Sequence, residues 1–351
     1  ISTPRRHAAN KFILYSLVAI IAFATAIVWQ LAGPDNASVF TAAKPLTRSG
    51  GQEGQPRMSP DQQYLLYTEI AANKMRLFIK QLSDGSTTEV MPEADSNAWV
   101  GPGSWNASGD KLVYLVASKE YCRYYLQTFD VMTLGEPQLI HNCPAGSYGK
   151  IAFTHNDKLL VYTERAAADA PYELFTLELA TGKKRKLNQP PLVLAGNVSF
   201  DLHPTQNKLL VSSVDEQMWE RFYSLDLATD ALELLFKLDS YICCGIWDHS
   251  GERIVLMGEH PAVQLISYDL QGKDRQVIYA GSQQLHEPER HPNGRDYVFA
   301  AGSSNLDVHF YGFSSRQTQQ IANTSVDDRL AVISPTRCSA SGSTIGIASR
   351  P

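Results

Sequence analysis

The stretch SPDQQYLLYTE at residues 59–69 decides the fold, because its polar turn and apolar strand recur along the chain. The strands begin at positions 65, 112, 159, 209, 254 and 297, which are 47, 47, 50, 45 and 43 positions apart. Short apolar runs between Gly, Pro, Asn and Asp residues are typical of antiparallel strands. The other copies are NASGDKLVYLV (106–116), THNDKLLVYTE (154–164), HPTQNKLLVSS (203–213), DHSGERIVLMG (248–258) and HPNGRDYVFAA (291–301).

A second strand follows each copy and ends in its own turn, as in ELFTLELATG (173–182) and RFYSLDLATD (221–230). A third short strand, and the segment that leads into each copy, bring the repeat to four strands. Four strands of about six residues and four turns of about five need roughly 44 residues, which agrees with the observed spacing. A four-stranded unit of this period is typical of a β-propeller, whereas helical repeats would need amphipathic helices.

We therefore expect an all-β protein, a β-propeller of about seven four-stranded blades over residues 39–335. Six copies are clear, and a seventh begins at Ser334-Pro335 and fades into a Ser-rich segment. Residues 336–351 are predicted to be a tail or an incomplete last blade, so we expect the natural protein to continue beyond them.

An uninterrupted apolar run, FILYSLVAIIAFATAIVWQLA, occupies residues 12–32. As a helix these 21 residues span about 31 Å, close to the roughly 30 Å hydrocarbon core of a bilayer. We predict a transmembrane helix that begins at Phe12 and ends at Ala32, with Trp29 near the interface. The alternative is a cleaved signal peptide with its small-residue site at 24–26.

The charges on either side of this run predict its orientation. Residues 1–11 contain three Lys or Arg residues, whereas Asp35 follows the run. The positive-inside rule then makes 1–11 a basic cytoplasmic stub and 33–38 a linker. It places the propeller on the opposite side of the membrane from this stub.

The composition excludes several classes of protein. The chain of 351 residues is 44% hydrophobic and 19% charged, which is inconsistent with a disordered or collagen-like protein. Its formal net charge of -5 argues against nucleic-acid binding by these residues, since nucleic-acid binders normally carry excess basic residues.

The sequence contains no motif that identifies an enzyme. A G-x-S-x-G nucleophile elbow and a G-x-G-x-x-G phosphate loop are both absent. The segment HEPERH at 286–291 differs from the H-E-x-x-H zinc motif, and Pro288 prevents a regular helix, so we interpret it as a repeat turn. We expect no catalytic residue, no metal ligand and no cofactor.

The cysteines suggest one disulfide. Cys122 opens the third strand of the second repeat and Cys143 closes its fourth, so an antiparallel hairpin would place them side by side. A disulfide is predicted for an oxidising periplasm, and two separate thiols are the alternative. Cys243 and Cys244 lie in the predicted innermost strand of the fifth repeat and could form a vicinal disulfide or stay reduced.

Two tryptophans occupy equivalent positions of the repeat, just before its polar turn. These are Trp105 and Trp247, and Met58 and Leu202 take the same position in other copies. We interpret this position as packing between blades.

The Ser-Pro-Asp or His-Pro-Asn-Gly turn, the apolar strand and the Asp-Leu-Ala-Thr-Gly unit resemble the TolB-like propeller repeat over roughly residues 39–335. A basic stub, one membrane crossing and such a propeller together resemble the CadC/ToxR-type membrane-anchored transcriptional regulators. That resemblance implies a cytoplasmic winged-helix domain outside this chain, and DNA binding only through that domain.

The resemblance implies a helix in the bacterial inner membrane and a periplasmic sensor that signals across this membrane, with dimerisation in the membrane as one route. An unknown ligand or protein is expected at the mouth of the central channel or on the loops of one face. Two alternatives remain open. One is a TolB-like envelope scaffold without a transcriptional role, and the other is the non-catalytic propeller of a prolyl-oligopeptidase-like peptidase.

Overall fold

The computed structural model describes residue 40 and residues 42–91, 93–240, 244–258 and 264–302, together with 308–312, 316–322, 329–333 and 340–343. These residues form strands and turns and no helix, so none of them makes a helix suited to crossing a bilayer. The predicted stub, transmembrane helix and linker, with Phe12, Trp29 and Ala32, lie outside the described residues.

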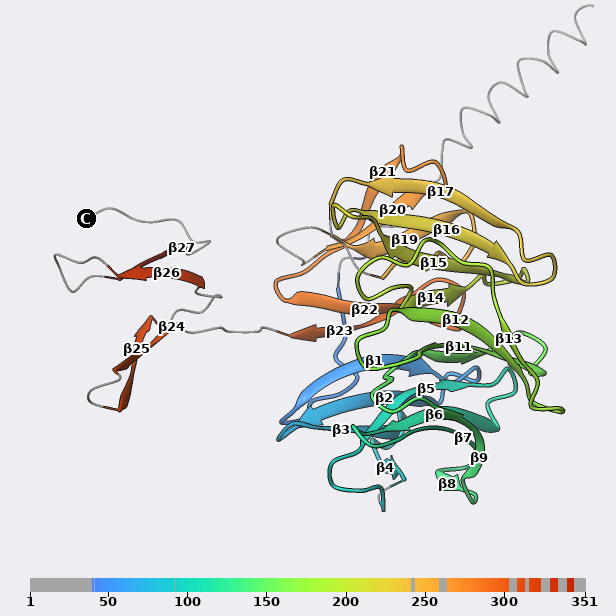
Figure 1. Ribbon diagram of the computed structural model, residues 1–351. Coiled ribbons are helices and arrows are strands. Elements are labelled where there is room, and N and C mark those ends of the chain that lie inside the picture. Colours follow the sequence, from blue (N-terminus) through green and yellow to red (C-terminus); the bar gives the residue numbers. More distant parts are fainter. Residues whose placement is uncertain are drawn as a thin grey trace, which may run out of the picture. The chain divides into compact units, whose positions relative to one another are not determined.

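Three antiparallel sheets come first in the chain (Figure 1). The first contains β1 (Gln52–Met58), β2 (Tyr64–Ala71), β3 (Lys74–Gln81) and β4 (Thr87–Val90). The second contains β5 (Trp99–Trp105), β6 (Lys111–Ala117), β7 (Cys122–Asp130), the short β8 (Thr133–Leu134) and β9 (Gln138–Cys143). The third contains β10 (Ile151–Phe153), β11 (Leu159–Arg165), β12 (Tyr172–Glu178) and β13 (Lys184–Lys186).

Two further four-stranded sheets and three strand pairs follow. The fourth sheet contains β14 (Ser199–Leu202), β15 (Lys208–Val214), β16 (Glu220–Asp226) and β17 (Leu232–Leu238). The fifth contains β18 (Ile246–Trp247), β19 (Arg253–Met257), β20 (Gln264–Asp269) and β21 (Arg275–Ala280). The pairs are β22 (Gln284–Arg290) with β23 (Tyr297–Gly302), β24 (Val308–Gly312) with β25 (Gln317–Ala322), and β26 (Arg329–Ile333) with β27 (Ala340–Ser343).

Apolar side chains of the middle strands hold neighbouring sheets together. In β3, for example, Met75, Leu77 and Ile79 are buried at alternate positions. Full burial of each such side chain contributes about 1.5–3 kcal/mol. The sheet-to-sheet cores contain Leu66, Leu77, Val100 and Leu112, then Leu115, Tyr124, Ile151 and Leu160, then Val161, Leu174, Phe200 and Leu209, and then Leu210, Phe222, Trp247 and Ile254.

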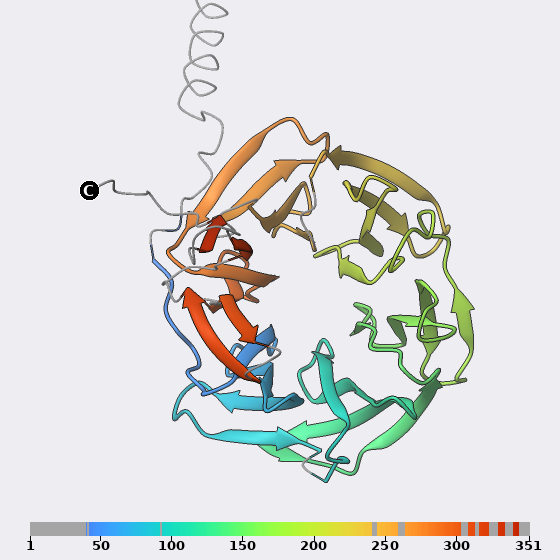
Figure 2. The same cartoon turned by 60° about the vertical axis from the view of Figure 1, so that its left-hand side comes forward.

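The pair β22–β23 closes this series into a ring (Figure 2). It contacts β19 of the fifth sheet on one side and β1 of the first sheet on the other. On the β1 side, Val298 packs with Met58, Leu65 and Tyr67. The fold is therefore the predicted all-β propeller.

The predicted number of about seven blades is wrong, because the residues that the structure describes form five complete blades. Since β22 and β23 contact both the fifth and the first sheet, no gap is left for a seventh sheet between them. Among the described residues, the later strands pair with one another, β24 with β25 and β26 with β27, rather than extending β22–β23 into a four-stranded blade.

The repeated turn between the first and second strands of a blade explains the sequence pattern. Its fourth position has a left-handed backbone at Gly109, Gly251 and Gly294, where φ is 75°, 74° and 74°. Glycine adopts this conformation without the steric cost that a Cβ brings. Gln62 and Asp157 occupy the same position with φ of 65° and 55°, so polar residues accept the turn as well.

Candidate functional site

Charged side chains from the first strands of the blades meet near the axis of the ring. They come from β1, β14 and β22 and from the residue that precedes β10. First strands from blades so far apart in sequence can exchange side-chain contacts only if they line the centre, and Figure 2 shows them nearest to it. We call this set the axial cluster, and its members are Arg57, Lys150, Asp201, Glu287, Glu289 and Arg290.

Arg290 is the best-connected member of the axial cluster. Its guanidinium donates hydrogen bonds to the carboxylate of Asp201, to the carbonyl of Trp247 at 2.8 Å and to the carbonyl of Leu202 at 2.7 Å. Asp201 also accepts a hydrogen bond from the backbone N–H of Trp247 at 2.9 Å. One side chain of β22 is thereby bonded to the fourth and fifth blades.

The opposite side of β22 is bonded to the first blade. Glu289 forms an ion pair with Arg57, and Glu287 accepts a hydrogen bond from the backbone N–H of Gln55 at 2.5 Å. Each strand carries a β-bulge that contains a proline, between residues 54 and 57 in β1 and between residues 286 and 289 in β22. The bulges interrupt regular pairing, which suits a proline because it has no N–H to donate.

Lys150 completes the axial cluster from the third blade. Its ammonium donates a hydrogen bond to the backbone carbonyl of Phe200 at 2.6 Å. The same ammonium lies 5.2 Å from the centre of the Phe200 phenyl ring. Burial, followed by the positive charge of the nearby Arg57, lowers the pKa of the Lys150 ammonium to about 7. Asp201 and Glu287 act in the opposite direction.

The arrangement of the axial cluster favours cohesion of the ring over chemistry. Three cationic side chains meet three carboxylates, and each has a bond or ion pair to a neighbouring blade. In the part of the chain that the structure describes, no group of three or more His, Cys, Asp or Glu residues is placed to hold a metal ion.

A cavity of about 290 Å³ lies between the fourth and fifth blades. Its lining includes His203, Lys208, Glu233 and Trp247. The rings of His203 and Trp247 are buried and meet edge to face with centroids 4.9 Å apart. We assign this cavity to the packing of the two blades.

The residues predicted to pack between blades lie in the sheet-to-sheet cores. Met58, Trp105 and Trp247 are buried, and Leu202 is partly buried against the core between the third and fourth blades. The Trp105 indole N–H donates to the carbonyl of Arg57 in the first blade at 3.2 Å.

The two cysteines of the predicted hairpin are bonded to each other. Cys122 in β7 and Cys143 in β9 are paired in register and form a disulfide with Cα atoms 4.9 Å apart. Cys244 is also disulfide-bonded, whereas Cys243 lies outside the described residues.

Sequence reasoning missed the axial cluster, although one signal was present. The interpretation of residues 286–291 as a turn is wrong, because residues 286–290 belong to strand β22. The available signal is the presence of two carboxylates and an arginine within four positions, directly before the polar turn of a repeat. Their partners Arg57 and Asp201 are 232 and 89 positions away from Glu289 and Arg290 respectively, so no local pattern could identify them.

Comparisons with known proteins agree with this architecture. The fold is similar to TolB from Acinetobacter baumannii, with a TM-score of 0.53 and 17% identity over 76% of this chain and 62% of that one. It is also similar to a protein assigned as TolB from Agrobacterium tumefaciens, with a TM-score of 0.54 and 15% identity over 74% of this chain and 94% of that one. A nidogen/laminin complex contains a similar fold, with a TM-score of 0.54 and 13% identity over 68% of this chain and 84% of that one.

These matches define the class of fold. The chain has the fold of TolB-like β-propellers, and it spans less than two thirds of the length of the Acinetobacter TolB chain. No protein-family model matches the sequence, and no curated protein matches it.

Replacing Arg290 with Met should destabilise the ring. Asp201 and two backbone carbonyls would remain buried without the guanidinium, so we expect the free energy of unfolding to fall by about 3 kcal/mol. Urea denaturation followed by circular dichroism measures the change. The matched control, Arg295→Met, breaks an exposed ion pair with Asp296 and should leave the midpoint unchanged. Similar midpoints for both variants would contradict the role of Arg290.

Lys150 should make stability depend on pH. The unfolded chain holds this proton up to about pH 10.5, whereas the folded chain releases it near pH 7. Between these values the unfolded chain binds more protons, so the free energy of unfolding should rise with pH, by up to about 1.4 kcal/mol per unit from this group. Lys150→Met lacks the titration, so the wild type should gain stability relative to it between pH 7 and pH 9. The free energy of unfolding of both proteins is measured by urea denaturation at each pH. A difference between wild type and variant that stays constant from pH 7 to pH 9 would exclude this effect.

Proposed function

We propose that this chain is a protein-binding scaffold of the bacterial envelope and catalyses no reaction. The observation that carries the proposal is the TolB-like propeller fold, with a TolB structure and a protein assigned as TolB among its neighbours. One further neighbour comes from a complex between proteins, the nidogen/laminin structure, so the architecture is compatible with protein binding there. Function depends on particular sites and not on the fold alone, so the partner must be recognised by particular surfaces of the propeller.

The axial cluster supports a structural role for the centre of the ring. Its charges are paired with one another and with backbone groups of other blades. A ligand that entered at this level would have to replace bonds that close the ring, which makes deep axial binding unfavourable. The loops at the ends of the strands are therefore the surfaces that we assign to a partner.

A photo-cross-linking experiment tests the scaffold. We would place a benzophenone amino acid at the exposed Gln217, between β15 and β16, and in parallel at the exposed Lys183, in the turn between β12 and β13 at the opposite end of the strands. A discrete protein adduct in the cells that make this protein is expected from at least one end. Absence of adducts from both ends, with the propeller folded, would overturn the proposal.

The finer form of the proposal is a sensor that belongs to a membrane-bound transcriptional regulator. The sequence observation that favours it is the apolar run at 12–32 with basic residues before it and Asp35 after it. In this form the propeller lies in the periplasm and a DNA-binding domain lies in the cytoplasm.

Reporter fusions at residue 40 test the predicted topology. Alkaline phosphatase should be active and green fluorescent protein dark when fused there, because the predicted periplasm supports only the first. A pair of fusions that ends before residue 12 is the control, with the opposite result. Fluorescence from the fusion at residue 40 would exclude the sensor form while leaving a scaffold in another compartment testable by cross-linking.

A further inference from the structure

We propose that two loops at one end of the fourth blade form a docking platform for a protein segment that combines apolar and basic side chains. The platform consists of Leu192, Leu194 and Val198 in the loop before β14, and Met218 and Trp219 in the loop between β15 and β16. The inference rests on the proposed scaffold function and specifies the chemistry of its partner.

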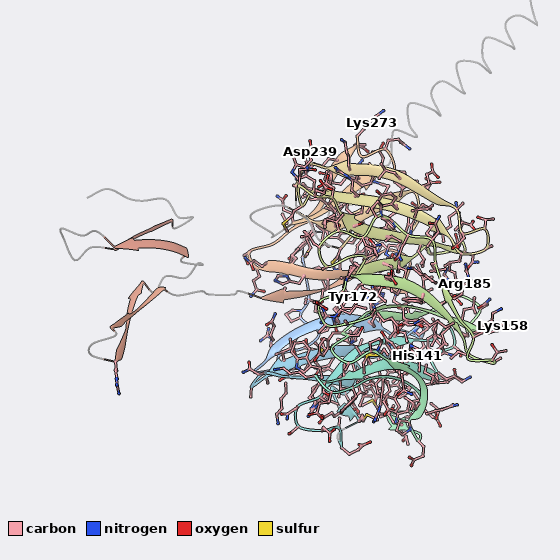
Figure 3. The ribbon with its side chains drawn as sticks, viewed as in Figure 1. His141, Lys158, Tyr172, Arg185, Asp239 and Lys273 are labelled. Carbon is pink, nitrogen blue, oxygen red and sulfur yellow. A yellow bond between two sulfur atoms is a disulfide. The ribbon has the colours of Figure 1, made fainter. Side chains whose placement is uncertain are left out.

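Strand register places both loops at the same end of the fourth blade. Ser199 at the start of β14 pairs with Ser212, and β15 ends two residues later at Val214. Val198 therefore lies beside the last residues of β15, from which the loop with Met218 and Trp219 begins. Figure 3 shows Tyr172 and Asp239, which belong to this end of the strands, to the left of Lys158 and Arg185, which belong to the opposite end.

The loop before β14 is held rigidly against the third blade. The backbone N–H of Tyr172 donates to the carbonyl of Ala195 at 2.8 Å. The backbone N–H of Asn197 donates to the carbonyl of Tyr172 at 2.9 Å. The buried Asn197 side chain donates to the carbonyl of Pro190 at 3.1 Å. At Gly196 a Cβ would lie 2.5 Å from the Tyr172 carbonyl oxygen, so only glycine fits this close approach.

The second loop is held by Asp215. One carboxylate oxygen accepts hydrogen bonds from the backbone N–H groups of Gln217 at 3.0 Å and Trp219 at 2.9 Å, and the other forms an ion pair with Arg221. A short, internally bonded loop of this kind loses little entropy when a partner binds, which favours affinity.

Both loops present apolar side chains from a left-handed backbone. Leu194 has φ of 51° and is 62% exposed, and Met218 has φ of 63° and is 46% exposed. Left-handed conformations are costly for bulky residues and concentrate at functional sites. Among the described residues, five of the eight large apolar side chains that are exposed belong to these two loops. An exposed apolar set that includes Trp and Met is typical of a protein interface.

The charges around the platform select the partner. The loop segments at this end, residues 166–171, 188–198, 215–219 and 239–240, contain Asp169, Asp215, Glu216 and Asp239 and no Lys, Arg or His. Within the described part of the chain, Asp215 alone of these four carboxylates forms an ion pair, and its partner is Arg221. The rim therefore attracts Lys and Arg side chains that flank an apolar contact, and it repels an anionic lipid surface.

Defined peptides test the platform on the full chain. The probes are a 14-residue amphipathic peptide of Leu and Lys, the same peptide with Glu for Lys, and the same peptide with Ser for Leu. Binding is measured by anisotropy of a labelled peptide, and the change in tryptophan fluorescence that is lost in a Trp219→Phe variant reports on the platform. We expect the Leu/Lys peptide to bind about tenfold more tightly than either control peptide.

Two variants separate the platform from general attraction to an acidic protein. Leu194→Ser combined with Trp219→Ser should weaken the Leu/Lys peptide about tenfold, whereas Val131→Ser, at another exposed apolar side chain, should not. Asp169→Asn combined with Glu216→Gln changes only exposed charges and should reduce the preference for Lys over Glu. Circular dichroism and thermal melting confirm folding of each variant.

Three results would overturn the platform. The first is unchanged binding of the Leu/Lys peptide by the variant with Leu194→Ser and Trp219→Ser. The second is equal binding of the Lys and Glu peptides by the wild type. The third is binding of zwitterionic lipid vesicles, instead of the peptide, through Leu194 and Trp219. If any of these occurs while cross-linked adducts still form, the scaffold stands and the platform is wrong. Loss of adducts from both ends of the propeller would reject the scaffold itself.

Discussion

The hydrogen bonds of Arg290 are the interaction on which the ring depends. Sheet-to-sheet cores join each blade to the next, but the incomplete sixth unit has only β22 and β23 with which to hold the first and fifth blades. Its charged residues supply the missing connections, with Arg290 bonded to Asp201 and two carbonyls, and Glu289 paired with Arg57. Because these groups are largely buried, removal of one partner would leave the other as an unpaired buried charge, which destabilises the protein.

This means of closure divides the molecule between two tasks. The axis is occupied by charges that satisfy one another, so its polar groups stabilise the ring. The loops at the strand ends are not needed to close the ring. In the fourth blade they carry exposed leucine, methionine and tryptophan side chains on a backbone fixed by Asn197 and Asp215. A rigid ring with preorganised apolar loops is the arrangement that a binding scaffold needs.

The repeat could be predicted from the sequence because each turn and strand is a local feature. The left-handed glycine positions and the alternation of Met75, Leu77 and Ile79 depend on neighbouring residues. The number of blades could not be predicted in the same way. Repeat copies show where strands form. Whether β24 also pairs with β23, and so extends β22–β23 into a four-stranded blade, depends on packing between distant parts of the chain. The same limit hid the roles of Glu287, Glu289 and Arg290.

The sequence by itself determined the strands, the turns and the hairpin that brings Cys122 beside Cys143, since these positions are only 21 residues apart and share one pair of strands. Only the tertiary structure decided that five blades and a strand pair complete the ring, that Arg290 meets Asp201, and that Leu194 and Met218 face solvent at one end. The physical reason is range: hydrogen bonds of turns and hairpins join nearby residues, whereas ring closure depends on how all the sheets pack together.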